Sequence, residues 1–171
     1  MNSNIIRNKL STIDRVLSVL DENLRILSTK TLNLGISVYN QQDQDIRVLA
    51  DTPDEYEKAL GTISRMMEVT LSNMIRDIKL LDPSLDLSGF DVNIRSVLSY
   101  TKIMEYALFP LKKSICVAID TTDKDVISKS MLDLKVVSNE LSMNIKNSKI
   151  AVLAIKESAD KLRNLLESGG D

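Results

Sequence analysis

The amino-acid sequence predicts an all-α fold: a long antiparallel four-helix bundle with up-down-up-down topology, in which helices 1 and 4 are longer than helices 2 and 3. Apolar residues recur at alternating spacings of three and four over long stretches, which is the period of a helix packed along one face. Only 5 Gly and 3 Pro occur in 171 residues, so few turns divide the chain into few, long elements. A content of 43% hydrophobic and 27% charged residues is typical of a globular chain. Residues 1–171 are therefore expected to form a single domain.

The first helix is predicted over Ser3–Gln41. Ser3 suits the N-cap position, where a side-chain oxygen accepts a hydrogen bond from a free backbone N–H. One apolar stripe runs along the helix in alternating steps of four and three, which is typical of helices in bundles and coiled coils. Its members are Ile6, Leu10, Ile13, Leu17, Leu20, Leu24, Leu27, Thr31, Leu34 and Val38.

The second helix is predicted over Pro53–Leu81, because proline is favoured in a first turn and Pro83 ends the periodic pattern. The third is predicted over Asp91–Ile119. Pro110 lies inside this third pattern and lacks the N–H that would bind the carbonyl of Tyr106, so a kink or a break is expected there. The predicted apolar face of the second helix carries Tyr56, Leu60, Ile63, Met67, Met74, Ile78 and Leu81.

The fourth helix is predicted over Asp123–Glu167. It carries two rows of mostly apolar residues, and each row repeats every seven residues, as expected for a helix in a shallow-angle bundle. One row comprises Ile127, Leu134, Leu141, Ser148, Ile155 and Leu162, and the other comprises Met131, Ser138, Ile145, Val152, Ala159 and Leu166.

The lengths of the predicted helices suggest an interface. At 1.5 Å per residue, helices 1 and 4 would be about 55 and 65 Å long, and helices 2 and 3 about 43 Å each. The topology then leaves the start of helix 1 and the last turns of helix 4 overhanging at one end, with apolar residues partly exposed in a monomer. Further apolar residues lie off the main stripes, where they form either a wide core face or an intermolecular interface. The candidate interface residues are Ile5, Ile6, Leu10, Val16, Val19, Val136, Met143, Ile150, Leu162 and Leu166.

Residue types that carry most catalytic chemistry are missing. The chain has no histidine and a single cysteine, which removes the commonest general base and the usual transition-metal sites. No glycine-rich phosphate loop is present. Two acidic clusters, Asp43 with Asp45 and Asp120 with Asp123 and Asp125, stand where helix ends need caps or where loops face solvent. No enzymatic activity, metal site or cofactor is therefore expected.

The cellular setting follows from composition. Cys116 lies among apolar neighbours, so a buried, inert thiol is expected and no intrachain disulfide is possible. The net charge of −2 demands no anionic partner. The first residues lack the pattern of a signal peptide, and no apolar run approaches a membrane span. The expectation is a cytoplasmic protein.

Basic residues follow one line along the predicted fourth helix. A solvated face is the ordinary interpretation of such a line. The alternative is an edge that contacts nucleic-acid phosphates, because Ser142–Lys156 contains no acid. Aromatic residues for base stacking are missing, so such binding would not depend on sequence. The possible phosphate-contacting residues are Lys135, Lys146, Lys149, Lys156 and Arg163.

Three functions from different classes follow. The favoured one is a non-catalytic structural or interaction protein that self-associates, or docks a helical partner, through its long first and last helices. The first alternative is a small helical subunit of a nucleoprotein complex that contacts phosphates through the basic line. The second is a ligand-sensing bundle with a pocket near Pro110, around which Tyr100, Tyr106 and Phe109 are expected to pack.

Overall fold

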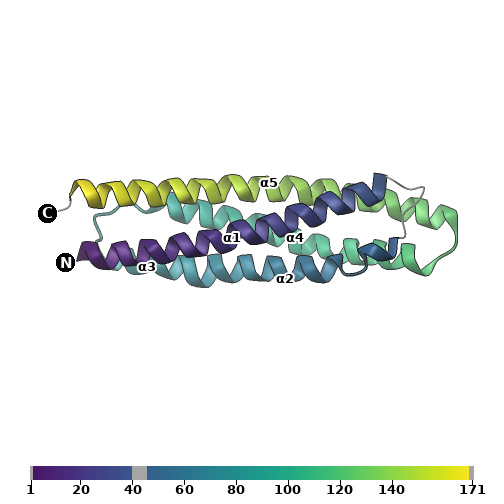
Figure 1. Ribbon diagram of the computed structural model, residues 1–171, viewed down its shortest axis with the longest axis horizontal. Helices are drawn as coiled ribbons and strands as arrows, with labels where there is room; N and C mark the ends of the chain where they lie inside the picture. Colours follow the sequence, from purple (N-terminus) through teal and green to yellow (C-terminus); the bar gives the residue numbers. More distant parts are fainter. Residues whose placement is uncertain (1, 40–45, 170–171) are drawn as a thin grey trace.

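The computed structural model describes residues 2–39 and 46–169, apart from the side chain of Ile46. All secondary structure in these residues is helical, which confirms the predicted all-α class. Three of the helices follow one another without a break and form one rod, so four helical rods pack together (Figure 1). The elements are α1 (Asn2–Tyr39), the 3-10 helix η1 (Ile46–Leu49), α2 (Thr52–Arg65), the π-helix η2 (Met66–Leu71), α3 (Ser72–Leu81), α4 (Ser88–Asp120) and α5 (Lys124–Ser168).

The stripe predicted for the first helix is confirmed. Every member, from Ile6 to Val38, is buried in α1. The helix begins one residue before the predicted Ser3. Its predicted end at Gln41 lies outside the described residues.

Helix α2 passes into α3 through the π-helix η2, which the periodicity does not predict. Buried positions here follow Ile63, Met67, Leu71 and Ile75, which are three successive steps of four. The wider turns of a π-helix keep such steps on one face, whereas an α-helix would rotate them away from it. The buried face therefore includes Leu71 and Ile75, and the predicted Met74 is only half-buried.

Helix α4 continues through Pro110 without a break. Met104 before the proline and Leu111 after it are both fully buried, so one apolar face persists on both sides of it. The helix begins at Ser88, three residues before the predicted Asp91. Proline removes one backbone hydrogen bond here, and the packing of both flanking turns holds the helix together.

Both seven-residue rows predicted for the fourth helix are buried in α5, except for the half-buried Ile127. The carboxylate of Asp123 caps this helix by accepting a hydrogen bond of 2.9 Å from the backbone N–H of Asp125. The capping interpretation of this acidic cluster is therefore confirmed for Asp123, and Asp125 is an acidic residue of the first turn.

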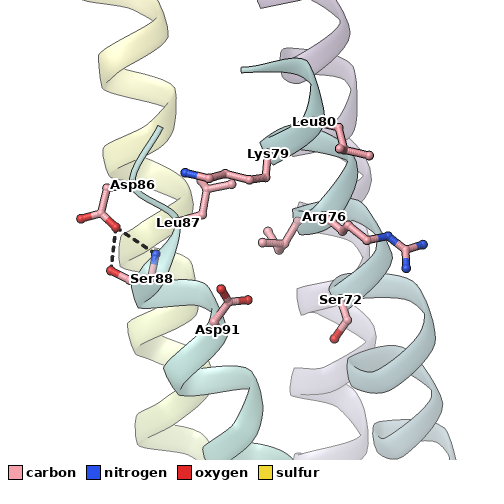
Figure 2. Close-up of a pocket in the computed structure, with 9 residues that line it drawn as sticks. Ser72, Arg76, Lys79, Leu80, Asp86, Leu87, Ser88 and Asp91 are labelled. Atoms are coloured by element: carbon pink, nitrogen blue, oxygen red, sulfur yellow. Dashed lines mark hydrogen bonds between the residues drawn. The ribbon is translucent and has the colours of Figure 1, made fainter. Parts of the chain in front are cut away.

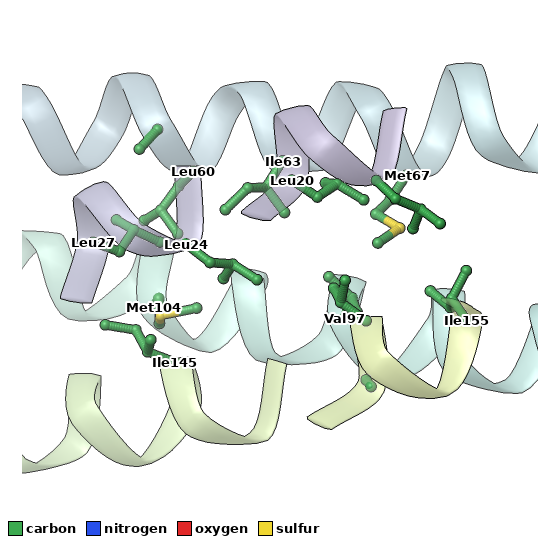
Figure 3. Close-up of a cluster of buried hydrophobic side chains, with 14 of the residues drawn as sticks. Leu20, Leu24, Leu27, Leu60, Ile63, Met67, Val97, Met104, Ile145 and Ile155 are labelled. Atoms are coloured by element: carbon green, nitrogen blue, oxygen red, sulfur yellow. The ribbon is translucent and has the colours of Figure 1, made fainter. Parts of the chain in front are cut away.

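The apolar core lies along the axis of the molecule and takes side chains from all four rods (Figure 3). Leucines of α1 meet residues of α2, η2, α4 and α5 in the view. The burial of each such side chain contributes roughly 1.5–3 kcal/mol relative to exposure, so this shared core is the main source of stability. The labelled members are Leu20, Leu24, Leu27, Leu60, Ile63, Met67, Val97, Met104, Ile145 and Ile155.

Both termini lie at one end of the molecule, and the connection between α4 and α5 projects at the other end (Figure 1). Helix α3 also reaches the terminal end, where the side-chain amide of Asn2 donates to the carbonyl of Leu81 over 2.9 Å. The guanidinium of Arg7 donates to the carbonyl of Leu166 over 3.1 Å. The start of α1 therefore has both α3 and the end of α5 beside it, and α1 and α5 do not overhang as an isolated pair.

Candidate interaction surface

Five of the predicted interface residues belong to the chain's own core. Ile6, Leu10, Val16, Leu162 and Leu166 are all buried, and none exposes more than 8% of its surface. The expectation that the apolar residues at the terminal end stay partly exposed in a monomer is therefore wrong. The physical reason is that α3 reaches this end as well, so the local layer contains more than two helices.

The other predicted interface residues are exposed. Ile5 and Val19 lie on the outside of α1 as single apolar side chains, which is common on protein surfaces. Val136, Met143 and Ile150 form a row on α5 with a spacing of seven, and they are 67%, 65% and 59% exposed. These three therefore share one outward face of α5.

Two exposed leucines extend this row. Leu132 precedes Val136 by one turn and Leu153 follows Ile150 by one turn. We refer to the five residues as the α5 stripe: Leu132, Val136, Met143, Ile150 and Leu153. An exposed apolar row of this length is the kind of feature that marks a contact with another molecule.

Exposed apolar residues of α1 border the α5 stripe on one side. Leu32, Ile36 and Tyr39 line a shallow groove of about 360 Å³ between α1 and α5. Gly35 of α1 and Ser138 of α5 both line it, and a Cβ atom at residue 35 would lie 3.6 Å from the Ser138 hydroxyl, an ordinary van der Waals distance. The groove widens the apolar surface beyond α5 alone.

A larger groove lies on the other side of α5, between α4 and α5. We call it the hairpin groove; its volume is about 660 Å³. Pro110, Lys113 and Val117 line it from α4. From α5 it is lined by Val126, Lys129, Ser130, Asp133, Val136, Val137 and Glu140. It therefore combines apolar walls with charges of both signs.

Three aromatic residues expected to pack around Pro110 do not form a pocket there. Tyr106 and Phe109 are among the most exposed large side chains of the chain, and Tyr100 is half-exposed. Pro110 instead contributes to the hairpin groove. The packing predicted for Tyr106 and Phe109 is wrong, because the buried face of α4 is already filled by its aliphatic stripe.

Two of the predicted phosphate-contacting residues bind acids of α1. The ammonium of Lys156 lies 2.5 Å from a carboxylate oxygen of Asp21. The guanidinium of Arg163 lies 2.7 Å from Asp14 and 2.8 Å from Asp160. Both positive charges therefore form ion pairs within the chain, and either side chain would have to break an ion pair to bind a phosphate.

The remaining basic residues divide into two groups. The ammonium of Lys135 lies 4.7 Å from the centre of the Tyr39 ring, a cation–π contact. Lys146 and Lys149 are exposed. Of the five predicted residues, therefore, these last two present the most accessible charge.

A third groove, of about 500 Å³, lies between α3 and the start of α4 (Figure 2). A hydrogen bond from the hydroxyl of Ser88, and a second from its backbone N–H, hold the pKa of Asp86 below its usual range. The ammonium of Lys79 donates to the carbonyl of Leu85 over 2.5 Å. Both charged groups thus have partners at the connection between α3 and α4, Lys79 with Leu85 in the loop and Asp86 with Ser88, the first residue of α4, which gives them a structural role.

Acidic and thiol groups do not converge in the described part of the chain. No three side chains from Asp, Glu and Cys come together there as a metal site would require. Asp43 and Asp45 of the first acidic cluster lie outside the described residues. Cys116 is exposed, so the expectation of a buried thiol is wrong. The buried turn positions of α4 are taken by Ile115 and Ala118, which leaves residue 116 facing outward.

Comparisons of the chain with models of protein families, with curated proteins and with solved structures found no match. Among residues 2–39 and 46–169, no helix combines the length and the apolarity needed to cross a membrane. The case for a function therefore rests on the surfaces described above.

Proposed function

We propose that this chain is a non-catalytic interaction protein, which self-associates or docks a helical partner on the exposed side of α5. The observation that carries the proposal is the α5 stripe. Five large apolar side chains stand on one face of a single helix, each more than half exposed. Covering them with a partner would remove apolar area from water at roughly 25 cal/mol per Å².

The spacing of the α5 stripe favours a helix as the partner. Its members and the polar residues between them follow steps of four, three, four, three, four and three along α5. This is the heptad spacing by which one helix packs along another. Polar residues within such a seam restrict the register and the choice of partner. The full seam is Leu132, Val136, Asn139, Met143, Lys146, Ile150 and Leu153.

The proposal includes the up-down-up-down topology with long first and last helices. Support comes from the ion pairs Asp14–Arg163 and Asp21–Lys156, because residue numbers rise along α1 as they fall along α5. The proposal places the contact on the first two thirds of α5, counted from the α4–α5 connection, and away from the termini. There the apolar borders of Leu32 and Ile36 add to the surface.

The test uses a photoactivatable amino acid at Ile150, and the same amino acid at Lys161 as the control. Both positions are exposed on α5, and Lys161 lies beyond the α5 stripe. Irradiation of the purified protein, and of cells that produce it, should yield a covalent protein adduct at Ile150 and none at Lys161. Absence of any protein adduct at Ile150 in both settings would reject the proposed function.

A further inference from the structure

A second seam on α5 faces the hairpin groove. Its positions follow steps of three, four, three, four and three, which again is heptad spacing. All six side chains are exposed, and the first five line the groove. The groove seam consists of Val126, Lys129, Asp133, Val136, Glu140 and Met143.

The outer positions of the groove seam are complementary when it is read in opposite directions, and its central positions place Asp133 opposite Val136. It carries apolar residues at both ends, a base near one end and an acid near the other. If Lys129 lies opposite Glu140 of a second chain, then Val126 lies opposite Met143 of that chain. A two-fold axis repeats each contact, as an interface between identical chains requires.

We infer that a second copy of this chain occupies the hairpin groove, with its α5 antiparallel to α5 of the first copy. This inference rests on the proposed function. The axis lies between Asp133 and Val136, and two Lys129–Glu140 pairs flank it. The apolar contacts between Val126 and Met143 close the seam at each end. The apolar residues Pro110 and Val117 of α4 form the outer wall against which the second copy packs.

The α4–α5 hairpin extends beyond the described part of α1. Lys135 packs on Tyr39, the last described residue of α1, so α5 before Lys135 projects past that point. Figure 1 shows the α4–α5 connection extending beyond the described end of α1. Two such hairpins laid side by side complete a layer of four helices, in which each groove receives a helix of the other copy.

The register follows from the length of α5. Moving the second copy by one heptad would place Lys129 opposite Asp133, and the two-fold axis would repeat that charge pair. Glu140 and Met143 would then face residues before Lys124, where α5 begins. Only the register that pairs Lys129 with Glu140 uses all six positions of the groove seam within the helix.

Charge reversal tests this arrangement in the full chain. Lys129→Glu and Glu140→Lys place like charges together, so each variant alone should dimerise at least about tenfold more weakly than the wild type in sedimentation experiments. An equimolar mixture of the two variants should form a heterodimer, because both of its charge pairs are then opposite. The double variant should also regain dimerisation.

The matched control is the pair Glu157→Lys and Lys161→Glu, which reverses exposed charges on α5 outside the groove seam. It should leave dimerisation unchanged, and circular dichroism should show equal helix content in every variant. A monomeric wild type at the highest concentration reached would overturn the inference. So would a wild-type dimer that ignores both single reversals, or folded single variants that fail to combine on mixing. If adducts at Ile150 nevertheless form with another protein, the proposed function stands and the second copy is excluded as the occupant.

Discussion

The hydroxyl of Tyr56 on α2 shares a hydrogen bond with the hydroxyl of Thr31 on α1, inside the apolar core. Both hydroxyls also donate to the carbonyl of Leu27, Thr31 over 2.7 Å and Tyr56 over 3.3 Å. Both side chains are almost fully buried. Burial raises the pKa of the Tyr56 hydroxyl above its ordinary value, since the phenolate would lie in an apolar environment.

This pairing predicts a pH-dependent effect of Tyr56→Phe. At neutral pH the variant loses one buried hydrogen bond, which should lower the free energy of unfolding by about 1 kcal/mol. Tyr56 of the unfolded chain ionises near pH 10, whereas in the folded chain it stays neutral, so the wild type loses stability as the pH rises past about 10. The phenylalanine variant has no hydroxyl to ionise at residue 56, so it does not lose stability in this way. Urea unfolding at pH 7 and about pH 11 should show that the difference in free energy of unfolding between the wild type and the variant becomes smaller at the higher pH. A difference that stays constant would contradict this explanation.

Ser148→Ala should stabilise the protein. Ser148 is completely buried in α5, and its hydroxyl has no hydrogen-bond partner among the described residues. Removing an unsatisfied buried hydroxyl should raise the free energy of unfolding by about 1 kcal/mol. Thr101→Val is the control, because the buried hydroxyl of Thr101 donates to the carbonyl of Val97 over 2.7 Å and its loss should not stabilise. If Ser148→Ala and Thr101→Val change the free energy of unfolding by the same amount in urea, the prediction is wrong.

Gly61→Ala should also stabilise. Gly61 lies inside α2, and a Cβ atom there would meet nothing within 4 Å. Replacing a helical glycine with alanine contributes about 1 kcal/mol when the added methyl group has room. Gly89→Ala should yield less, because its Cβ would lie 2.7 Å from the hydroxyl oxygen of Ser158. Thermal unfolding of both variants should show a smaller stabilisation for Gly89→Ala than for Gly61→Ala. Adding Ser158→Ala to the Gly89→Ala variant should restore the stabilisation that the close contact removes.

Cys116 should react with a thiol reagent in the native protein. Its side chain is exposed on α4, so no unfolding step needs to precede the reaction. We expect the native protein to be modified at a rate close to that of the urea-unfolded chain, and circular dichroism should be unchanged afterwards. A reaction that is many times slower in the native protein than in the unfolded chain would show that the Cys116 thiol is not exposed.

Nucleic-acid binding by the isolated chain should be weak and should depend on Lys146 and Lys149. The ion pairs of Lys156 and Arg163 with acids of α1 leave few charges for phosphates. Fluorescence anisotropy with duplex DNA at low salt should therefore show a shallow salt dependence. Changing Lys146 and Lys149 to Glu should abolish what binding remains. A steep salt dependence in the wild type would support the nucleoprotein interpretation instead.

The two rows of α5 and the stripe of α1 illustrate what periodicity predicts well. Long amphipathic helices bury whichever residues share one face, and that face follows from spacing alone. The signal for η2 was also present, as the four-residue steps from Ile63 to Ile75, but a pattern matched to α-helical turns passes over it. The periodicity left open whether Val136, Met143 and Ile150 widen the core face or lie outside it, and the structure places them on the exposed side of α5.

The sequence by itself determined the helical class, the approximate helix bounds, most of the buried faces and the absence of histidine chemistry, since these depend on residue types and local spacing. Only the tertiary structure decided which apolar and charged side chains stay exposed after the helices have packed together. The contact between Asn2 and Leu81 sets α3 beside the start of α1, which buries Ile6 and Leu10. The approach of α1 to α5 pairs Lys156 with Asp21. These outcomes depend on how far the rods slide along one another, and axial offset is set by packing between distant residues that no local period encodes.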